Sequence, residues 1–528
     1  MKNSYEVVVV GSGFGGSVTG CRLALAGRSV AILEKGIEWA RTDFPRSPLE
    51  VANRGFWKKN KSYGLIEYKA FKRMDVVQGC GVGGGSLHYY NVNLRTPPEI
   101  FERPPWPEEV SGPVLDAYYQ RAEEMLESKP LEPPKGRKLP LKTTAFMNAA
   151  RAAGRPVEMV PIAVYSGEER KHPISGIPQD PCDYSGDCML GCTQQAKQTL
   201  DLNYLPLARK NGAEIHPLHE AIKIEPLGEK GFRVHFHRLD ADKPGQFEAG
   251  SVEAKQVVVA AGTLGSSELL LRCRDFYKTL PALGPNLGMR FSGNGDFILG
   301  STSNAQPRID PSRGPSITAM ADFSTPEHKV FIQDTGFPNP LAWLLEGLIP
   351  TSARFRNLLS VAKTYLVDSL GLKNGRIDFE IDRLLRGGAT SHRLPYLGMG
   401  TDAADGRLRL NKGWIELDWS HKQSRQVFRQ IEDGFRELSR QLGGKYTPSP
   451  LWRWPKRKLL TAHPLGGCFM GSSAQDSVVD HRGEVWAYPG LFVADGAVIP
   501  TALAVNPSLT IAALAERIAQ WMIHGKDV

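Results

Sequence analysis

The sequence has no stretch of about 20 continuously apolar residues, and this absence argues against a membrane-spanning helix. We also expect no export signal, because the first apolar run, Val7–Val10, leads directly into a glycine turn and is expected to be a buried strand. Cysteine is scarce. The seven cysteines are an odd number for a disulfide framework, so we expect reduced thiols and a cytoplasmic protein.

Concentrated positive charge is missing as well. The formal net charge is +9, but lysine and arginine are dispersed and no recognised nucleic-acid module accompanies them, so we expect no nucleic-acid partner. The excess charge favours weak contact with an anionic membrane surface. The 528 residues exceed what one hydrophobic core supports, so the sequence predicts two domains, and it leaves the oligomeric state open.

The N-terminal segment has the pattern of a dinucleotide-binding turn. A β-branched run ends at Gly11, which opens the run Gly-Ser-Gly-Phe-Gly-Gly, and residues typical of a packed helix follow. In such a unit Gly11 permits a tight turn, Gly13 lets the backbone approach a pyrophosphate, and Gly16 lets helix and strand pack closely. The next strand, 29–33, ends at Glu34, whose carboxylate can accept hydrogen bonds from ribose hydroxyls. This pattern fits NAD and FAD equally.

A second glycine-rich segment lies at 79–86. It has five glycines in eight positions, a composition that neither a packed helix nor a packed strand favours. Farther along, the β-branched run 257–259 leads into a turn at Gly262, and the strand 491–494 ends at Asp495. The sequence therefore contains several strand ends of the kind that hold a nucleotide.

The C-terminal part contains a histidine and an asparagine with catalytic potential. His463 opens the run His-Pro-Leu-Gly-Gly-Cys, and Asn506 immediately precedes a predicted helix, Pro507–Ile523, with proline in its first turn. An imidazole can accept a hydroxyl proton, and a helix N-terminus directs positive potential toward a nearby group. Alternatively, Asn506 is a simple helix N-cap, and both roles are compatible.

Taken together, these segments resemble the glucose-methanol-choline (GMC) flavoprotein oxidoreductases, most closely their cholesterol oxidase-like branch. The resemblance is strong at 5–36, 77–95, 186–205, 255–290 and 461–518. It implies an α/β composite fold, in which a Rossmann-type doubly wound FAD domain is assembled from discontinuous segments beside a substrate domain with an antiparallel sheet and helices. The implied FAD-binding segments are 1–42, 75–95, 200–300 and 456–528, and the implied substrate-binding segments are 43–74, 96–199 and 301–455.

The resemblance also implies roles for particular residues. His463 would be the base above the flavin, and Asn506 would orient the substrate or the reduced flavin. His88 matches a position where some family members attach the flavin covalently, although a non-covalent neighbour of the ring is the simpler interpretation. The segment that would carry an isomerising glutamate is not recognisable, and Glu380 is a candidate by rough position only. The implied cofactor-binding residues are Gly11, Gly13, Phe14, Gly16, Glu34, Gly83, Gly84, Ser86, His88, Tyr89, Ala221, Gly262, Asp495, Gly496, Pro507 and Ser508.

The implied activity is FAD-dependent oxidation of an alcohol group on a bulky, hydrophobic, sterol-like molecule, with hydride passing to flavin N5 and electrons passing to O₂ to give H₂O₂. Three alternatives stay open. They are a dehydrogenase that uses another electron acceptor, a light-driven decarboxylase of the same superfamily, and a catalytically silent flavin-binding protein. Because the last two do not need a base over the flavin, His463 with Asn506 argues against both.

Two further features are interpreted from the residues alone. Cys182, Cys188 and Cys192 are spaced like a ferredoxin cysteine run whose second position is Ser185. An iron–sulfur cluster or zinc would fit three thiolates, but we expect no metal and favour buried or redox-active thiols. Apolar segments at 341–349 and 358–372 are predicted to form a core helix pair or a lid, and the strands at 407–410 and 414–419 are expected in the antiparallel sheet.

Overall fold

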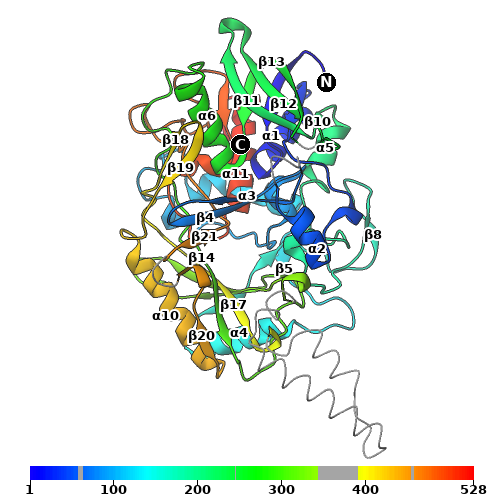
Figure 1. The fold of residues 1–528 in the computed structure, drawn as a ribbon, viewed down its shortest axis with the longest axis vertical. Coiled ribbons are helices and arrows are strands. Elements are labelled where there is room, and N and C mark those ends of the chain that lie inside the picture. Colours follow the sequence, from blue (N-terminus) through cyan, green and yellow to red (C-terminus); the bar gives the residue numbers. More distant parts are fainter. Residues whose placement is uncertain (58–62, 244, 343–389, 453–456) are drawn as a thin grey trace, which may run out of the picture.

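The computed structural model describes residues 1–57, 63–243, 245–342, 390–452 and 457–528. Two large sheets lie toward opposite ends of the long axis, and the C-terminal helix belongs to the half that holds the larger sheet (Figure 1). Glu380 and most of the two predicted helices at 341–372 lie outside the described residues, so the structure does not address them.

The larger sheet has seven strands. Strands β10, β2, β1, β13 and β22 are parallel, and β12 and β11 add an antiparallel edge. The order is β10-β2-β1-β13-β12-β11, and β22 pairs with β13. The central strands are rich in valine and buried on both faces, as expected for a parallel sheet covered by helices. Its strands are β1 (Ser4–Val10), β2 (Val30–Leu33), β10 (Glu214–His216), β11 (His219–Pro226), β12 (Phe232–Leu239), β13 (Phe247–Val259) and β22 (Leu491–Val493).

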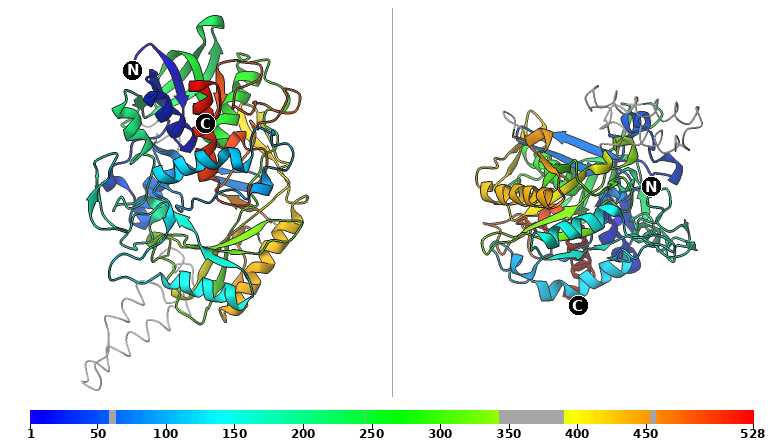
Figure 2. Two further views of the ribbon diagram at one scale, coloured as in Figure 1. Left: turned by 180° about the vertical axis from the view of Figure 1, so that it is seen from behind. Right: turned by 90° about the horizontal axis from the view of Figure 1, so that it is seen from below.

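Helices from distant parts of the chain pack around this sheet. The first helix lies against the last, so the two ends of the chain meet in one layer (Figures 1 and 2). The first helix begins at Phe14, directly within the glycine turn. The helices of this part are α1 (Phe14–Leu25), α3 (Gly112–Met125), α5 (Tyr204–Lys210), α6 (Gly262–Leu271) and α11 (Ser508–His524).

The second large sheet has six strands and is antiparallel throughout, in the order β20-β14-β17-β16-β15-β6. Helix α10 (Arg425–Gln441) covers it with an apolar face made by Val427, Phe428, Ile431, Phe435 and Leu438. Helix α4 (Leu141–Ala152) packs there too. The strands are β6 (Val157–Met159), β14 (Phe297–Ser303), β15 (Ala319–Asp322), β16 (Val330–Asp334), β17 (Leu394–Gly400) and β20 (Lys445–Thr447).

Smaller sheets complete the described structure. A three-stranded sheet, β21-β4-β3, lies between the large sheets and brings the segment before His463 beside the second glycine loop (Figure 1). The remaining elements are β3 (Ile66–Ala70), β4 (Met74–Gly79), β21 (Leu459–Thr461), β5 (Lys129–Pro130), β7 (Pro161–Ile162), β8 (Arg170–Lys171), β9 (Pro178–Gln179) and the short helix α2 (Pro48–Glu50). Within the described residues, no helix combines the length and apolar character needed to cross a bilayer.

One assignment from the sequence was wrong. The predicted strands at 407–410 and 414–419 exist as β18 (Arg407–Asn411) and β19 (Trp414–Asp418), but they pair only with each other. Their hairpin packs on α6 and not in the six-stranded sheet. Alternating burial of side chains such as Leu408 indicates a strand, but it carries no information about which partner the strand takes.

Candidate active site

The two glycine-rich loops touch each other at the N-terminus of α1. A side chain at Gly84 would place its Cβ 2.5 Å from the Cα of Gly13, so only glycine fits there. Nothing lies within 4 Å of where a Cβ on Gly13 would be, which leaves its backbone open to a ligand. No side chain caps the helix, so its first amide groups remain available to a phosphate. This cradle fits the pyrophosphate of a dinucleotide.

Glu34 lies between the same two loops and is almost fully buried. One carboxylate oxygen accepts hydrogen bonds from the Ser12 hydroxyl at 2.8 Å and the Ser12 amide at 3.1 Å, and the other accepts from the Gly36 amide at 2.9 Å. Its backbone carbonyl accepts from the amide of His219, two residues before the half-buried Ala221 on β11. The Glu34 carboxylate therefore links the first glycine turn, through Ser12, to the turn at Gly36. Its contact with ribose stays a prediction.

Asp495 closes the opposite side of the cradle at the end of β22. Its carboxylate accepts from the amides of Gly262 and Ala497, both at 2.8 Å, and from the Ser266 hydroxyl. Burial raises the pKa of Asp495 to about 6. The next residue, Gly496, accepts a hydrogen bond from the Gly466 amide, which ties the nucleotide cradle to the segment that begins at His463.

The segment after the second glycine loop carries His88 and Tyr89. The Tyr89 ring packs edge-on against Phe14 with 5.5 Å between ring centroids, and its hydroxyl donates to the carbonyl of Gln198. Ser86 in the same segment is buried and accepts from the amide of Leu200. Burial, followed by repulsion from Lys197 and His463, lowers the pKa of His88 to about 3, so its imidazole is neutral.

His463 is held by a buried carboxylate. Its Nδ1 lies 2.9 Å from Oδ1 of Asp296, and the Asp296 side chain is fully buried. The other oxygen, Oδ2, accepts from the Thr461 hydroxyl at 2.8 Å and the Ala462 amide at 2.9 Å. The Asp296 carboxylate is thus bonded at both of its oxygens, and the His463 ring is fixed by the bond to Nδ1.

Asn506 lies beside the other ring nitrogen. Its Nδ2 is 3.5 Å from Nε2 of His463, at the outer limit of hydrogen bonding, and its Oδ1 accepts from Nε2 of Gln333 at 2.7 Å. The Asn506 side chain therefore faces the histidine, and it does not cap α11. The hydroxyl of Ser508 bonds to the carbonyl of Val92, and Pro507 occupies the capping position.

Sequence reasoning missed Asp296, Asn294 and Gln333, although all three are fully buried at this site. Asn294 accepts from the amides of Leu503 and Ala504 and donates to the carbonyl of Val505. For Asn294 and Asp296 the signal in the sequence was the alternation of polar residues with glycine in the run 292–296, and the sequence around Gln333 gave none.

The three cysteines of the 182–192 segment line one small cavity of about 20 Å³ together with Lys197. Burial raises the pKa of Cys182 and Cys192, which favours neutral thiols. Lys197 donates to the carbonyls of Leu87, Tyr89 and Cys188, and so ties this segment to the one that carries His88. In the part of the chain that the structure describes, no group of metal-ligating side chains is arranged to hold an ion, and the absence of metal stays a prediction.

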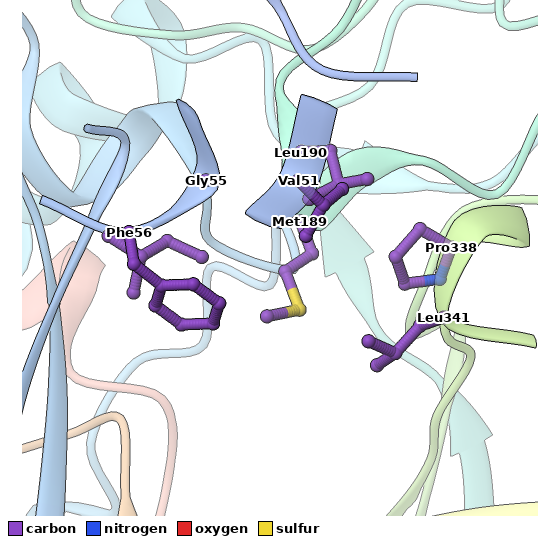
Figure 3. Close-up of a pocket in the computed structure, with 8 residues that line it drawn as sticks. Val51, Gly55, Phe56, Met189, Leu190, Pro338 and Leu341 are labelled. Atoms are coloured by element: carbon purple, nitrogen blue, oxygen red, sulfur yellow. The ribbon is translucent and has the colours of Figure 1, made fainter. Parts of the chain in front are cut away.

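A second cavity of about 20 Å³ is entirely apolar and has room for about one water molecule (Figure 3). Met189 reaches into it, and the Tyr90 hydroxyl lies 3.6 Å from the sulfur of Met189. Its size makes it a packing gap and not a pocket for a bulky ligand. It is lined by Val51, Gly55, Phe56, Ile66, Met189, Leu190, Pro338 and Leu341.

The fold and the glycine cradle together are those of a dinucleotide-binding protein. Models of the GMC oxidoreductase family match residues 5–288 and 403–515, and the chain belongs to this family. Its cofactor is FAD, and its enzymatic class is oxidation of alcohol groups. The fit of the glycine cradle, the free helix N-terminus and Asp495 to a dinucleotide agrees with this assignment.

Several characterised relatives span the whole chain. It is 29% identical to a cholesterol oxidase of Mycobacterium tuberculosis over 100% of this chain and 92% of the relative, and 27% identical to a cholesterol oxidase of Acinetobacter baumannii over 98% and 94%. A long-chain-alcohol oxidase of Arabidopsis thaliana is 24% identical over 98% of this chain and 67% of its own length. The fold is similar to that of pyridoxine 4-oxidase from Mesorbium loti, with a TM-score of 0.65, 18% identity and 99% of both chains covered.

Proposed function

We propose that this enzyme oxidises an alcohol group on a bulky hydrophobic, sterol-like substrate and uses O₂ as the electron acceptor, with release of H₂O₂. Support comes from the names of the relatives, which are oxidases of cholesterol and of long-chain alcohols. The observation that carries the proposal is the approach of Asn506 Nδ2 to His463 Nε2 at 3.5 Å, beside the segment with His88.

In this proposal His463 accepts the hydroxyl proton of the substrate at Nε2, and Asn506 orients the same hydroxyl through its amide. FAD, when bound, would supply the hydride acceptor for this reaction. At this separation Nε2 of His463 and Nδ2 of Asn506 can both contact one oxygen atom of a substrate, and such contacts commonly tighten when substrate binds. Cytoplasmic location and weak contact with anionic membranes remain proposals from the sequence.

The test is anaerobic reduction of the bound flavin by a panel of sterols, long-chain alcohols and small alcohols, followed by admission of air. We expect bleaching by the bulky hydrophobic alcohols and rapid return of the yellow colour with one H₂O₂ per turnover. Bleaching that persists in air and is reversed only by an added dye would contradict the oxidase proposal. In that case the iron content of the protein would show whether Cys182, Cys188 and Cys192 form an exit path for electrons.

Replacement of His463 by alanine tests the role of the base. We expect His463→Ala to retain its flavin and to reduce it more slowly by roughly 10²–10⁴, the usual contribution of a positioned acid–base group. Stopped-flow absorbance at saturating substrate measures this rate directly. Reduction at the wild-type rate would rule out His463 as the base while leaving the substrate assignment intact.

A further inference from the structure

The orientation of His463 and Asn506 is fixed by residues that come from elsewhere in the sequence. Asp296 lies 167 positions before His463 and bonds its Nδ1, and Gln333 lies 173 positions before Asn506 and bonds its Oδ1. Both side chains are fully buried, so solvent does not compete for these hydrogen bonds. The four side chains form one chain of contacts, in the order Asp296, His463, Asn506 and Gln333.

The contacts at both ends of this chain indicate that the hydrogen of neutral His463 lies on Nδ1 and not on Nε2. An ionised Asp296 can only accept, so Nδ1 of His463 carries the hydrogen and Nε2 carries the free electron pair. At the other end Gln333 donates to the Asn506 oxygen, so the NH₂ group of Asn506 faces Nε2. An amide NH₂ facing Nε2 requires the same unprotonated Nε2.

The opposite arrangement is disfavoured at the Asp296 end of the chain of contacts. If the Gln333 and Asn506 amides were both turned over, an amide oxygen would face Nε2, and Nε2 would need a hydrogen. A neutral His463 would then direct its remaining electron pair at the Asp296 carboxylate, 2.9 Å away. Two acceptors at hydrogen-bonding distance repel each other, and the buried carboxylate would lose a donor.

We propose that Asp296 is a positioning residue, which holds neutral His463 in the Nδ1–H tautomer so that Nε2 is free to take the substrate proton. This inference rests on the proposed function, in which His463 is the base. When Nε2 accepts the proton, the imidazolium stays bonded to the Asp296 carboxylate, which offsets the new positive charge. Gln333 holds Asn506 in the amide orientation that matches this tautomer.

The short run Ser292–Asp296 contacts both the segment that ends at His463 and the segment that leads into Asn506. Asp296 bonds the segment that ends at His463, and Asn294 bonds the backbone of 503–505, which leads directly into Asn506. Asn294 adopts a left-handed backbone conformation with φ of 57°, and Ser292 accepts from its amide. One buried turn thus sets the separation between the two active-site side chains.

The sharpest test is Asp296→Asn, because the neighbouring backbone decides how the new amide turns. The Ala462 amide is a fixed donor at 2.9 Å from the present carboxylate, so it takes the single oxygen of the new side chain and leaves its NH₂ group facing Nδ1. That geometry forces hydrogen onto Nε2 and removes the base. We expect flavin reduction to slow by roughly 10²–10⁴ while flavin content stays normal.

Three measurements distinguish a positioning role of Asp296 from a nonspecific structural effect of the substitution. In the wild type, acid should slow flavin reduction because a protonated Nε2 cannot act as the base, and this dependence on pH should be lost in Asp296→Asn, where Nε2 already carries a hydrogen. The double variant Asp296→Asn/His463→Ala should be no slower than His463→Ala alone, because Asp296 acts through the ring that is already missing. The matched control is Asp480→Asn, a buried turn carboxylate that bonds the amides of Arg482 and Glu484 and should leave flavin reduction unchanged.

The outcomes are distinguishable from failure of the proposed function. If His463→Ala reduces flavin at the wild-type rate, the proposed base is wrong and Asp296 has nothing to position. If His463→Ala is slow but Asp296→Asn retains the wild-type rate and pH profile, only the positioning role is wrong. A double variant much slower than both single variants would show that Asp296 acts independently of His463 and would also overturn the inference.

Discussion

At the residue scale, His88 is a buried side chain whose protonation differs between the folded and unfolded chain below neutral pH. Its pKa is lowered from 6.5 to about 3, first by burial and then by the nearby Lys197 and His463. Above pH 6.5 both states carry a neutral imidazole. Between pH 6.5 and about 3 the unfolded chain binds a proton that the folded chain does not, so acid favours unfolding.

Replacement of His88 by glutamine should therefore make the protein more resistant to acid. We expect the acid-unfolding midpoint of His88→Gln to lie at a lower pH than that of the wild type, with little change at pH 7. Circular dichroism during an acid titration measures the midpoint. The exposed His524 supplies a control, because His524→Gln should leave the midpoint nearly unchanged. An unchanged midpoint in His88→Gln would contradict the lowered pKa.

At the scale of elements, the junction of α1 and α11 joins the two ends of the chain. Arg22 of α1 makes a two-pronged ion pair with Glu516 of α11, at 2.7 and 2.9 Å, and the Tyr204 hydroxyl of α5 donates to the same carboxylate at 2.7 Å. The Glu516 side chain is fully buried. Three helices thus meet at one carboxylate.

Loss of this carboxylate should destabilise the fold. Glu516→Ala leaves the Arg22 guanidinium and the Tyr204 hydroxyl without their buried partner, and we expect a loss of about 3 kcal/mol in the free energy of unfolding. Glu38→Ala, which breaks an exposed two-pronged pair with Arg209, should cost less than about 1 kcal/mol. Denaturant titration of both variants checks the difference, and equal losses would contradict the structural role of Glu516.

At the scale of the whole molecule, FAD is expected to connect segments from both ends of the chain. The expected contacts run from the turn at Gly11 through the second glycine loop to Asp495 and Asn506. A ligand that binds only the folded state stabilises it by mass action, by about 2.7 kcal/mol at 100 times its dissociation constant.

Removal of the cofactor should therefore lower the melting temperature of the whole protein in a single step. We expect the flavin-free protein to melt at a lower temperature, and the melting temperature to rise with added FAD at about one FAD per chain. Thermal unfolding followed by tryptophan fluorescence measures both. A melting temperature independent of FAD, or recovery with NAD in its place, would contradict the cofactor assignment.

The sequence by itself determined the features whose chemistry is local. A β-branched strand that ends in spaced glycines can scarcely form anything other than a tight turn, so Gly11, Gly13 and Gly16 were recognisable without a structure. The run at His463 and the residue before the last helix, Asn506, were identified through their resemblance to one family. The family, the cofactor and the α/β fold followed from these segments and were confirmed.

Only the tertiary structure decided which side chains hold the catalytic candidates. Asp296 and Gln333 reach His463 and Asn506 across more than 160 residues, and no local pattern encodes such a meeting. The same reason explains why the strands at 407–418 were assigned to the wrong sheet. The alternation of side chains along a strand is local, whereas the strand's pairing partner is determined by long-range packing. Proton placement on His463 likewise depends on two buried partners that only the folded chain brings together.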